Sequence, residues 1–437
     1  MYKIYMEEAM NGLKNYEFVK HFYDLESKNH WDYIGKKDKP IDKIAPYPAK
    51  MVSDMQGEII SSIKNEIEIK SIFDPFMGSG TILTESVSLK IPEIYGNDIN
   101  PFSYLIVKVK TTKLNERSLK VHYTKLLNRI RDNQLIKNRY FSKITKWYEV
   151  DTIEQLSKIL NEIEVIKNKD IKDFFELGFA RLVKEVSNTR NTTFKLHIKE
   201  KEKITNIDNC LIRFKKIIDE QIKSCLEFWS EKEFDKIKVQ LFNEDLRKLK
   251  VNKKFDMIIT SPPYGDNKTT VTYGEFSILQ LRWLGCDKYT DTYSAIDSAS
   301  LGGTLCKTDE ITEIEIYKKS NLVRQIVDQL SIETSSEKPR KVVTFMQDFF
   351  ETMKNLNEHL NHSGTMILTV GNRKVNGNEI FFNKIIDEMA MAIGLKKLQE
   401  FSRNLPTTKK IASNTSKLKN GKSVKSMDKE YVLIYTR

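Results

Sequence analysis

The sequence predicts an α/β protein, a doubly wound, mostly parallel sheet with helices on both faces. Short apolar runs alternate with segments of helical periodicity, and several of these runs stop at a glycine turn or an acidic residue. The order strand, glycine turn, helix, strand, acid is a βαβ unit, which requires parallel strands. A chain of 437 residues exceeds one typical domain, so we expect insertions or a second domain.

The first part of the predicted sheet follows an aromatic-rich segment, residues 1–43, which we expect to form helices on the core. A helix is expected from Pro46 through Lys64, and the βαβ unit comes next. Its predicted elements are a strand at residues 70–73, a helix at 82–89, a strand at 93–96 and a helix that starts at Asn100-Pro101.

The middle of the chain has a different texture. Residues 113–236 contain no proline and a single glycine, Gly178, and their apolar residues recur at helical spacing. We therefore predict an all-helical insertion with a basic loop at residues 187–203. Residues 266–340 are rich in Thr, Ser and Gly and predict a second, loop-rich insertion.

Short apolar runs typical of strands recur after the helical insertion. The catalytic unit is therefore expected to comprise residues 44–112 and 237–437. We interpret residues 396–425 as a strongly basic, polar stretch. The remaining predicted elements are strands at 238–242, 255–260, 364–370 and 431–435 and helices at 342–360 and 381–393.

A glycine turn ends the first strand, in the sequence Asp74-Pro75-Phe76-Met77-Gly78-Ser79-Gly80-Thr81. Doubly wound sheets bind ligands at this edge. Glycines permit close backbone approach, and the start of the next helix offers amide donors. The spacing is not GxGxxG and no P-loop lysine follows, which favours an adenosine cofactor without a pyrophosphate over a dinucleotide or ATP. An ordinary tight βα connection is the alternative.

Acidic residues end the next two strands. Asp98 could accept hydrogen bonds from two ribose hydroxyls, or could cap the helix that begins at Pro101. Asp245 could accept from an adenine amino group, or could cap a turn. Three such features at successive strand ends make a cofactor site more plausible than any one of them alone.

The motif Ser261-Pro262-Pro263-Tyr264 follows the most apolar strand. The prolines fix the backbone and remove two amide donors, so that carbonyl acceptors are presented rigidly. Such acceptors could bind the hydrogens of an exocyclic amino group on a flat base, and the tyrosine ring could stack on that base. The alternatives are a Pro-Pro turn and a ligand motif for small adaptor domains.

The composition limits the function classes. Lys+Arg 72 against Asp+Glu 60 gives a net charge of +12, which fits a polyanionic partner or a lysine-rich proteome about equally well. The four cysteines form no CxxC pair and the histidines do not cluster, so we expect reduced thiols, a cytoplasmic protein and no metal. We find no signal peptide and no apolar run long enough to span a membrane.

Taken together, these motifs resemble those of the amino-group DNA methyltransferases of bacterial restriction–modification systems, which make N4-methylcytosine or N6-methyladenine. The resemblance covers residues 44–110 and 238–437. Residues 44–51 resemble the family's N-terminal motif, although Pro48 and Lys50 depart from its usual phenylalanine-bearing form. The segments that carry the resemblance are 74–81, 97–101, Asp245, 261–284, 370–373 and 403–430.

The resemblance implies a seven-stranded methyltransferase sheet with an antiparallel last strand, and the cofactor S-adenosylmethionine. It implies double-stranded DNA with a flipped target base as substrate, and a cognate restriction endonuclease as a partner. The implied cofactor-binding residues are Asp74, Phe76, Gly78, Gly80, Thr81, Asp98, Asn100 and Asp245. The implied catalytic residues are Ser261, Pro262, Pro263 and Tyr264.

Some alternatives stay open at the level of sequence. A serine at position 261 favours cytosine N4 over adenine N6, because Asp or Asn is more usual there for adenine. The rival functions are an RNA base amino-methyltransferase and a non-catalytic specificity subunit. Target recognition could lie in residues 113–236, 266–340 or 187–203. Arg282, Arg373 and Arg403 could be base readers or structural ion pairs, and lysines 409, 410, 417, 419, 422 and 425 could contact phosphates.

Overall fold

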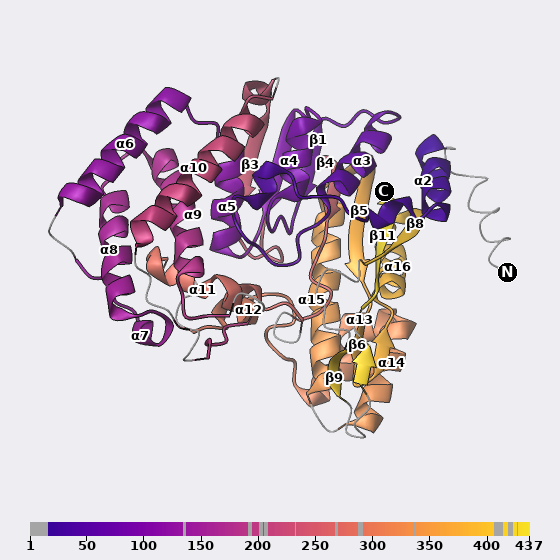
Figure 1. Cartoon of the computed structure of the whole chain (residues 1–437). Coiled ribbons are helices and arrows are strands. Elements are labelled where there is room, and N and C mark those ends of the chain that lie inside the picture. The colour runs from indigo at the N-terminus through magenta and orange to yellow at the C-terminus, as the bar shows by residue number, and fades with distance from the viewer. Residues whose placement is uncertain are drawn as a thin grey trace.

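A computed structural model of the chain has one seven-stranded sheet at its centre (Figure 1). The strand order is β3-β2-β1-β4-β5-β11-β8; the first five strands are parallel, and β11 is antiparallel to both of its neighbours. The strands are β1 (Ser71–Asp74), β2 (Glu93–Asn97), β3 (Lys238–Phe242), β4 (Phe255–Thr260), β5 (Leu360–Gly371), β8 (Lys396–Asn404) and β11 (Lys429–Thr436). The structure describes residues 16–133, 137–190, 195–200, 204, 209–231, 233–266, 270–286, 292–334, 337–405, 414–417, 423–425 and 427–437.

Helices cover both faces of the sheet, as the sequence predicts for a doubly wound fold. Side chains alternate between the faces along each strand. Ile72 and Ile259 pack in one buried cluster, with Ile59 and Leu83, whereas Phe73 packs on the opposite face. The helices of the first face are α3 (Ser53–Lys64), α4 (Thr81–Ser88) and α5 (Pro101–Thr111), and those of the second are α15 (Lys338–Glu358) and α16 (Phe382–Ala392).

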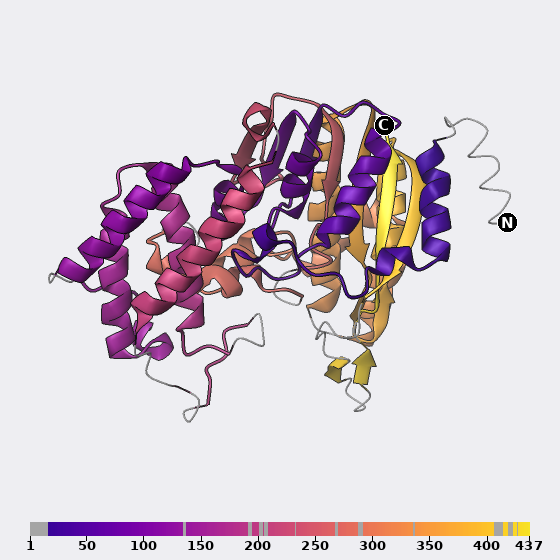
Figure 2. The same cartoon turned by 45° about the horizontal axis from the view of Figure 1, so that its top comes forward.

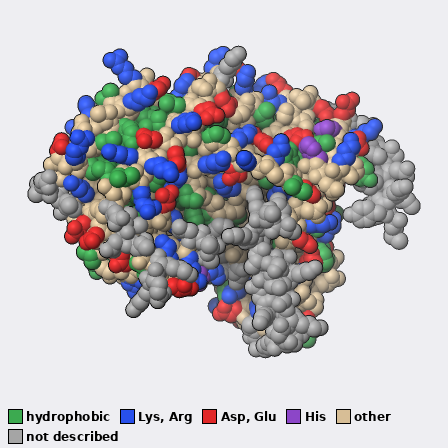
Figure 3. Space-filling model, viewed as in Figure 1, with side chains coloured by type: hydrophobic (Ala, Val, Ile, Leu, Met, Phe, Trp, Pro, Cys, Tyr) green, Lys and Arg blue, Asp and Glu red, His purple; other side chains and the backbone are tan. Residues whose placement is uncertain are grey.

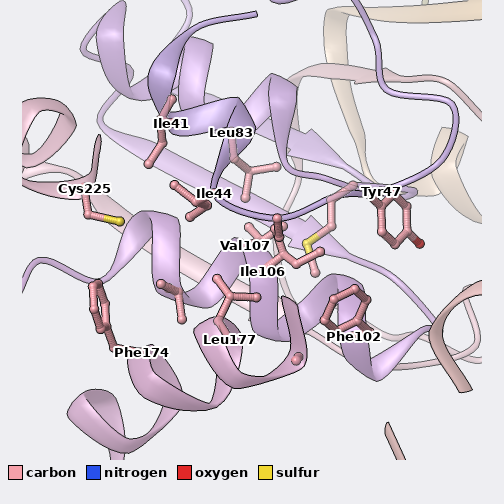
Figure 4. Close-up of a cluster of buried hydrophobic side chains, with 14 of the residues drawn as sticks. Ile41, Ile44, Tyr47, Leu83, Phe102, Ile106, Val107, Phe174, Leu177 and Cys225 are labelled. Atoms are coloured by element: carbon pink, nitrogen blue, oxygen red, sulfur yellow. The ribbon is translucent and has the colours of Figure 1, made fainter. Parts of the chain in front are cut away.

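Beyond the β3 edge of the sheet the chain forms a helical lobe (Figure 2). Its helices are α6 (Glu116–Asp132), α7 (Ile144–Trp147), α8 (Val150–Glu164), α9 (Lys169–Glu185) and α10 (Cys210–Trp229). The lobe is joined to the sheet by a continuous apolar core, because Phe174, Leu177 and Cys225 of the lobe pack in the same cluster as Ile106 and Leu83 (Figure 4). The described part of residues 113–236 is mostly helical, with irregular backbone at residues 137–143, 187–190 and 195–200.

The second insertion contains more helix than its composition suggested. Its main helix, α11, packs against α9 of the lobe and α5 of the sheet layer, so the two insertions are in direct contact. Its elements are α11 (Tyr273–Trp283), α12 (Ala295–Ala299), η5 (Thr308–Glu313), α13 (Glu315–Lys319) and α14 (Asn321–Glu333).

The remaining elements are short and lie outside the main sheet. The N-terminal helix α2 packs on β8, at the edge opposite the lobe. These elements are α2 (Glu17–Ser27), η1 (His30–Asp32), η2 (Pro40–Lys43), η4 (Phe234–Lys236), and the small pairs β6 (Arg373–Val375) with β7 (Asn378–Ile380) and β9 (Asn414–Lys417) with β10 (Ser423–Lys425).

Two sequence-based expectations are wrong. The helix expected from Pro46 begins only at Ser53, and the preceding residues are irregular, with Ala49 at φ +52°. The basic stretch 396–425 begins with strand β8. This strand is not predicted from the sequence because it lies at the edge of the sheet, where strands can carry charged side chains. Lysines 409, 410, 419 and 422 lie outside the described residues, and the side chains of Lys417 and Lys425 are not described either.

Candidate active site

A pocket opens at the carboxyl edge of β1, β2, β3 and β4. It encloses about 840 Å³ of space free of protein atoms, a volume that includes open solvent at its mouth. The lining residues are Tyr47–Met51, Pro75–Ser79, Thr81, Asn97–Asn100, Glu244–Leu246, Ser261, Pro263, Tyr273, Ile296 and Ala299–Leu301.

The glycine turn forms one wall and needs both of its glycines. Gly80 has φ +81° at the N-cap of α4, and a Cβ there would lie 2.8 Å from Val107 Cγ2. Gly78 has φ +48°, and a Cβ there would lie 3.4 Å from the Tyr47 ring. Side chains are strained at positive φ, so only glycine fits this path without cost. Gly80 shapes the turn but does not itself line the pocket.

Asp98 closes the turn from the neighbouring strand. Its Oδ2 accepts from the Gly78 amide at 3.0 Å, and its Oδ1 accepts from the Asn100 amide at 2.9 Å. Burial raises the pKa of this carboxyl, while the amide hydrogen bonds oppose the rise. Each carboxylate oxygen can accept more than one hydrogen bond, so Asp98 keeps acceptor capacity toward the pocket that it lines.

Asp74 lies beneath the turn rather than in the pocket. Its Oδ1 accepts from Thr260 Oγ1 at 2.6 Å and from the Phe76 amide at 3.2 Å. Its Oδ2 is buried and has no hydrogen-bond partner among the described residues. Burial raises the pKa of this carboxyl to about 7. Asp74 therefore supports the backbone of the turn from below.

A buried lysine ties the turn to other parts of the chain. Lys110 of α5 donates through Nζ to the Ser79 carbonyl oxygen at 2.8 Å and pairs with Asp42 Oδ1 at 3.3 Å. Its own carbonyl accepts from Trp229 Nε1 of α10 at 2.8 Å. Lys110 is 1% exposed, so this contact is part of the core.

Two further predicted cofactor residues line the pocket with their side chains already engaged. Asn100 caps α5 by accepting from the Phe102 amide at 3.0 Å. Asp245 accepts from Arg247 Nε at 3.0 Å and Nη2 at 2.9 Å, and the same arginine donates to Asp348 at 2.8 Å. Both residues thus have a structural role, whatever they bind.

The Ser-Pro-Pro-Tyr motif follows β4 directly and forms the opposite wall. Ser261 and Pro263 line the pocket, whereas Pro262 and Tyr264 do not. The Tyr264 hydroxyl lies 3.1 Å from Ser261 Oγ and donates to Glu430 Oε1 at 3.0 Å. Burial, with Glu430 nearby, raises the pKa of Tyr264 well above its usual value. The hydroxyl therefore keeps its proton at neutral pH.

The structure thus brings most of the sequence-predicted site into one pocket. Those that line it are Phe76, Gly78, Thr81, Asp98, Asn100, Asp245, Ser261 and Pro263, and those that support it from outside are Asp74, Gly80, Pro262 and Tyr264. Sequence reasoning missed Tyr273 and residues 296–301, which come from the second insertion, and Glu430 behind the clamp. Tyr273 lies in a stretch that carries the family resemblance; the sequence gives no signal for the others.

Two features are absent from the part of the chain that the structure describes. No group of three or more His, Cys, Asp and Glu side chains there could hold a metal ion. No helix there is long and apolar enough to cross a bilayer.

Comparisons with known proteins place these observations in context. The family model of the D12 class N6 adenine-specific DNA methyltransferases matches residues 54–280. The type II methyltransferase M.MvaI of Kocuria varians is 30% identical over 406 residues, which cover 89% of each chain. The type II methyltransferase M.MjaII of Methanocaldococcus jannaschii is 30% identical over 159 residues, which cover 36% of this chain and 29% of that one.

Solved structures add little to this. The rRNA methyltransferase aviRa from Streptomyces viridochromogenes aligns over 91% of this chain and 90% of its own, with 8% identity and a TM-score of 0.33. That score is too low to establish a shared architecture. The fold assignment instead depends on the strand order of the sheet itself.

Proposed function

The chain belongs to the family of the D12 class N6 adenine-specific DNA methyltransferases, and on that premise we propose that it methylates an exocyclic amino group of a base in double-stranded DNA with S-adenosylmethionine. One observation carries the proposal. A single pocket is lined both by the glycine turn with Asp98 and by Ser261 of the clamp. A cofactor and an amino group held on these two walls would therefore meet.

The residues of the first wall fit the cofactor. When bound, S-adenosylmethionine supplies an electrophilic methyl group. Asp98 retains acceptor capacity for the ribose hydroxyls, and Gly78 leaves room for close approach. Arg247 already donates to the Asp245 carboxylate. The adenine amino group would therefore use the lone pairs of Asp245 that Arg247 leaves free. Phe76 and residues 47–51 line the remainder of this wall.

The residues of the second wall fit an amino group. The lone pair of an exocyclic nitrogen is delocalised into its ring, so the nitrogen is a weak nucleophile. Ser261 Oγ and the carbonyl of Pro262 would accept its hydrogens and draw the nitrogen toward a tetrahedral geometry, in which the lone pair is localised on the nitrogen. Catalysis of this kind rests on positioning and electrostatics rather than on a strong general base. The base must first leave the helix, which costs a few kcal/mol.

Two bases are candidates for the target. The serine at position 261 favours cytosine N4, as the sequence motif suggests. The name of the matching family model favours adenine N6 as the second candidate. Both carry an amino group that the same acceptors could hold.

The surface that binds DNA is not evident from net charge. On the face shown in Figure 3, basic and acidic side chains are interspersed, and the described residues there form no single basic patch. We assign recognition to the two insertions, residues 113–236 and 266–340, because the second supplies part of the pocket wall and contacts the first. The catalytic unit would then be residues 44–112 and 237–437. A restriction–modification system implies a cytoplasmic location for the protein and a cognate restriction endonuclease as its partner.

One experiment tests the base, the position and the target sequence together. The gene is expressed in a host without DNA methylases, and the genomic DNA is sequenced for modified bases while its nucleosides are measured by mass spectrometry. We expect one modified base in one sequence context. Methyl transfer to RNA but not to DNA would contradict the proposal, as would an absence of transfer to both by folded protein that binds the cofactor.

A further inference from the structure

A chain of hydrogen bonds runs behind the clamp and ends in a charged pair. Ser261 Oγ lies 3.1 Å from the Tyr264 hydroxyl, which donates to Glu430 Oε1 at 3.0 Å. Glu430 Oε2 accepts from Arg403 Nε at 2.8 Å and Nη2 at 2.6 Å. Arg403 is 6% exposed, so the pair is largely shielded from water. The clamp is therefore connected to the two C-terminal strands of the sheet.

The strands fix this arrangement. Glu430 of β11 stands in register with Arg403 of β8 on one side and with Gly371 of β5 on the other. A Cβ on Gly371 would lie 2.9 Å from Tyr264 Cδ2, so only glycine at this position leaves room for the ring. The tyrosine ring is thus held between β5 and the end of β4, with its hydroxyl on the carboxylate.

The chemistry of these groups determines which group donates and which accepts in each hydrogen bond. A guanidinium only donates, and a carboxylate bound to it only accepts. The Tyr264 hydroxyl must therefore give its single hydrogen to Glu430. The contact between Tyr264 and Ser261 can then form only if the Ser261 hydroxyl donates to the tyrosine oxygen. Both lone pairs of Ser261 Oγ are left for the pocket, because no other partner of this atom occurs among the described residues.

We propose that Glu430, held by Arg403, is a positioning residue that fixes Ser261 as a hydrogen-bond acceptor and so makes the clamp select an amino base over its keto counterpart. The inference rests on the proposed function. It also explains how a serine, which can both donate and accept, serves where a carboxylate or amide oxygen is more usual. An oriented serine oxygen attracts amino hydrogens and repels a carbonyl oxygen at the same position.

The variant Glu430→Gln reverses the donor and acceptor roles in these hydrogen bonds with little change in the shape of the side chain. Arg403 would hold the amide oxygen, so that the amide nitrogen donates to Tyr264. The tyrosine would then donate to Ser261, and the serine hydrogen would face the pocket. We expect kcat on the target base to fall about tenfold or more, while the affinity for S-adenosylmethionine stays within about twofold, since the misdirected hydrogen bond lies at the clamp.

The decisive measurement is discrimination between two duplexes. Once the target sequence is known, binding is compared for duplexes with the target base and with its keto form, which is uracil for cytosine or hypoxanthine for adenine. We expect Glu430→Gln to reduce the preference for the amino duplex at least about tenfold. A loss of packing alone would weaken both duplexes alike. Tyr264→Phe frees the serine hydroxyl to rotate and should give an intermediate preference, which keeps the test valid if Glu430→Gln folds poorly.

Glu400→Gln is the matched control. Glu400 lies on β8, three residues before Arg403, and pairs with Lys384 and Lys397 at similar burial, but no hydrogen bond links it to Tyr264. The preference of Glu400→Gln for the amino duplex over the keto duplex should equal that of the wild type. An active wild type whose Glu430→Gln variant keeps its full preference would overturn this inference alone. A wild type that methylates no DNA would overturn the proposed function, and this inference with it.

Discussion

The two halves of the pocket are built in different ways. In the cofactor half, the amide of Gly78 donates to Asp98 across 20 positions of sequence, and the amides of Phe76 and Asn100 donate to Asp74 and Asp98 over two positions each. In the base half, the hydroxyl of Tyr264 reaches Glu430 across 166 positions, and the contacts join side chains of three strands. The glycine turn is thus held mainly through main-chain amides, although Asp74 also accepts from Thr260, whereas the clamp is held by side chains that lie far apart in sequence.

This difference shows what each half depends on. The amide contacts of the glycine turn lie within one βαβ unit, because the turn sets the positions of the donors. The base half requires β11 and β8 to add to the sheet first, since Glu430 and Arg403 come from those strands. We therefore expect that each half can be damaged without the other.

The largest expected effect falls on the cofactor half. In Asp98→Asn an amide nitrogen replaces one carboxylate oxygen and must face an amide donor, either that of Gly78 or that of Asn100. A hydrogen bond to a charged group contributes about 1.5–3 kcal/mol, so affinity for S-adenosylmethionine should fall about 100-fold. Titration calorimetry measures the affinity, and the preference between amino and keto duplexes should not change.

A control for this variant lies at the opposite edge of the sheet. Asp256 also accepts from two backbone amides, those of Lys70 and Ser71, each at 3.0 Å. Asp256→Asn should lower stability but leave cofactor affinity within about twofold. Equal losses of affinity in the two variants would show that Asp98 acts only through stability.

The second effect concerns the pH dependence of stability in the cofactor half. Asp74 has a pKa near 7 in the folded protein against 3.8 as its ordinary value, so the folded state binds this proton more tightly than the unfolded state. Its contribution to stability is present below about pH 4 and is lost as pH rises toward 7 and beyond. Asp74→Asn should therefore gain stability relative to the wild type as pH rises, by on the order of 2–4 kcal/mol.

Urea unfolding without cofactor at pH 5, 6, 7 and 8 measures this difference. The variant and the wild type should diverge between the first and the last of these values. A constant difference across them would mean that Asp74 ionises in the fold as it does in water.

The smallest effect falls on the base half. Arg403→Lys keeps the positive charge but replaces two donors on Glu430 with a single ammonium group. Losing one of two hydrogen bonds should cost about 1 kcal/mol, which corresponds to a fall in kcat of about fivefold. Steady-state kinetics with saturating cofactor measures it, and an unchanged cofactor affinity is the internal control. If Arg403→Lys instead lowered the affinity for the cofactor, the two halves of the pocket would be energetically coupled, which would contradict the comparison.

The predictability of the two halves follows the same division. The parallel strands, the turn and Asp98 are readable from sequence, because each depends on residues a few positions apart, and six of the seven strands are predicted near their observed places. The pocket contacts of Phe76, Gly78 and Asp98 follow from that order. Local chemistry is enough for this part of the molecule.

What the sequence does not reveal depends on long-range pairing. Strand β8 resembles a polar linker in sequence, since Lys397, Glu400 and Arg403 also pair with charged residues on other elements. Glu430 likewise has no local signal, because its partners lie 27 and 166 positions away. The irregular path at Ala49 replaces a predicted helix because Pro46 and Pro48 interrupt backbone hydrogen bonding.

The buried lysine described above has a thermodynamic consequence. Lys110 touches the carbonyl of Ser79 in the glycine turn, while its own carbonyl holds Trp229 of the helical lobe. The turn and the lobe therefore share one rigid contact. Coupling free energies are reciprocal, so a ligand that stabilised α10 through this contact would gain affinity by the same factor when α10 is packed in place. Lys110 thus adds a polar link between the glycine turn and α10 to the apolar core that joins the lobe to the sheet.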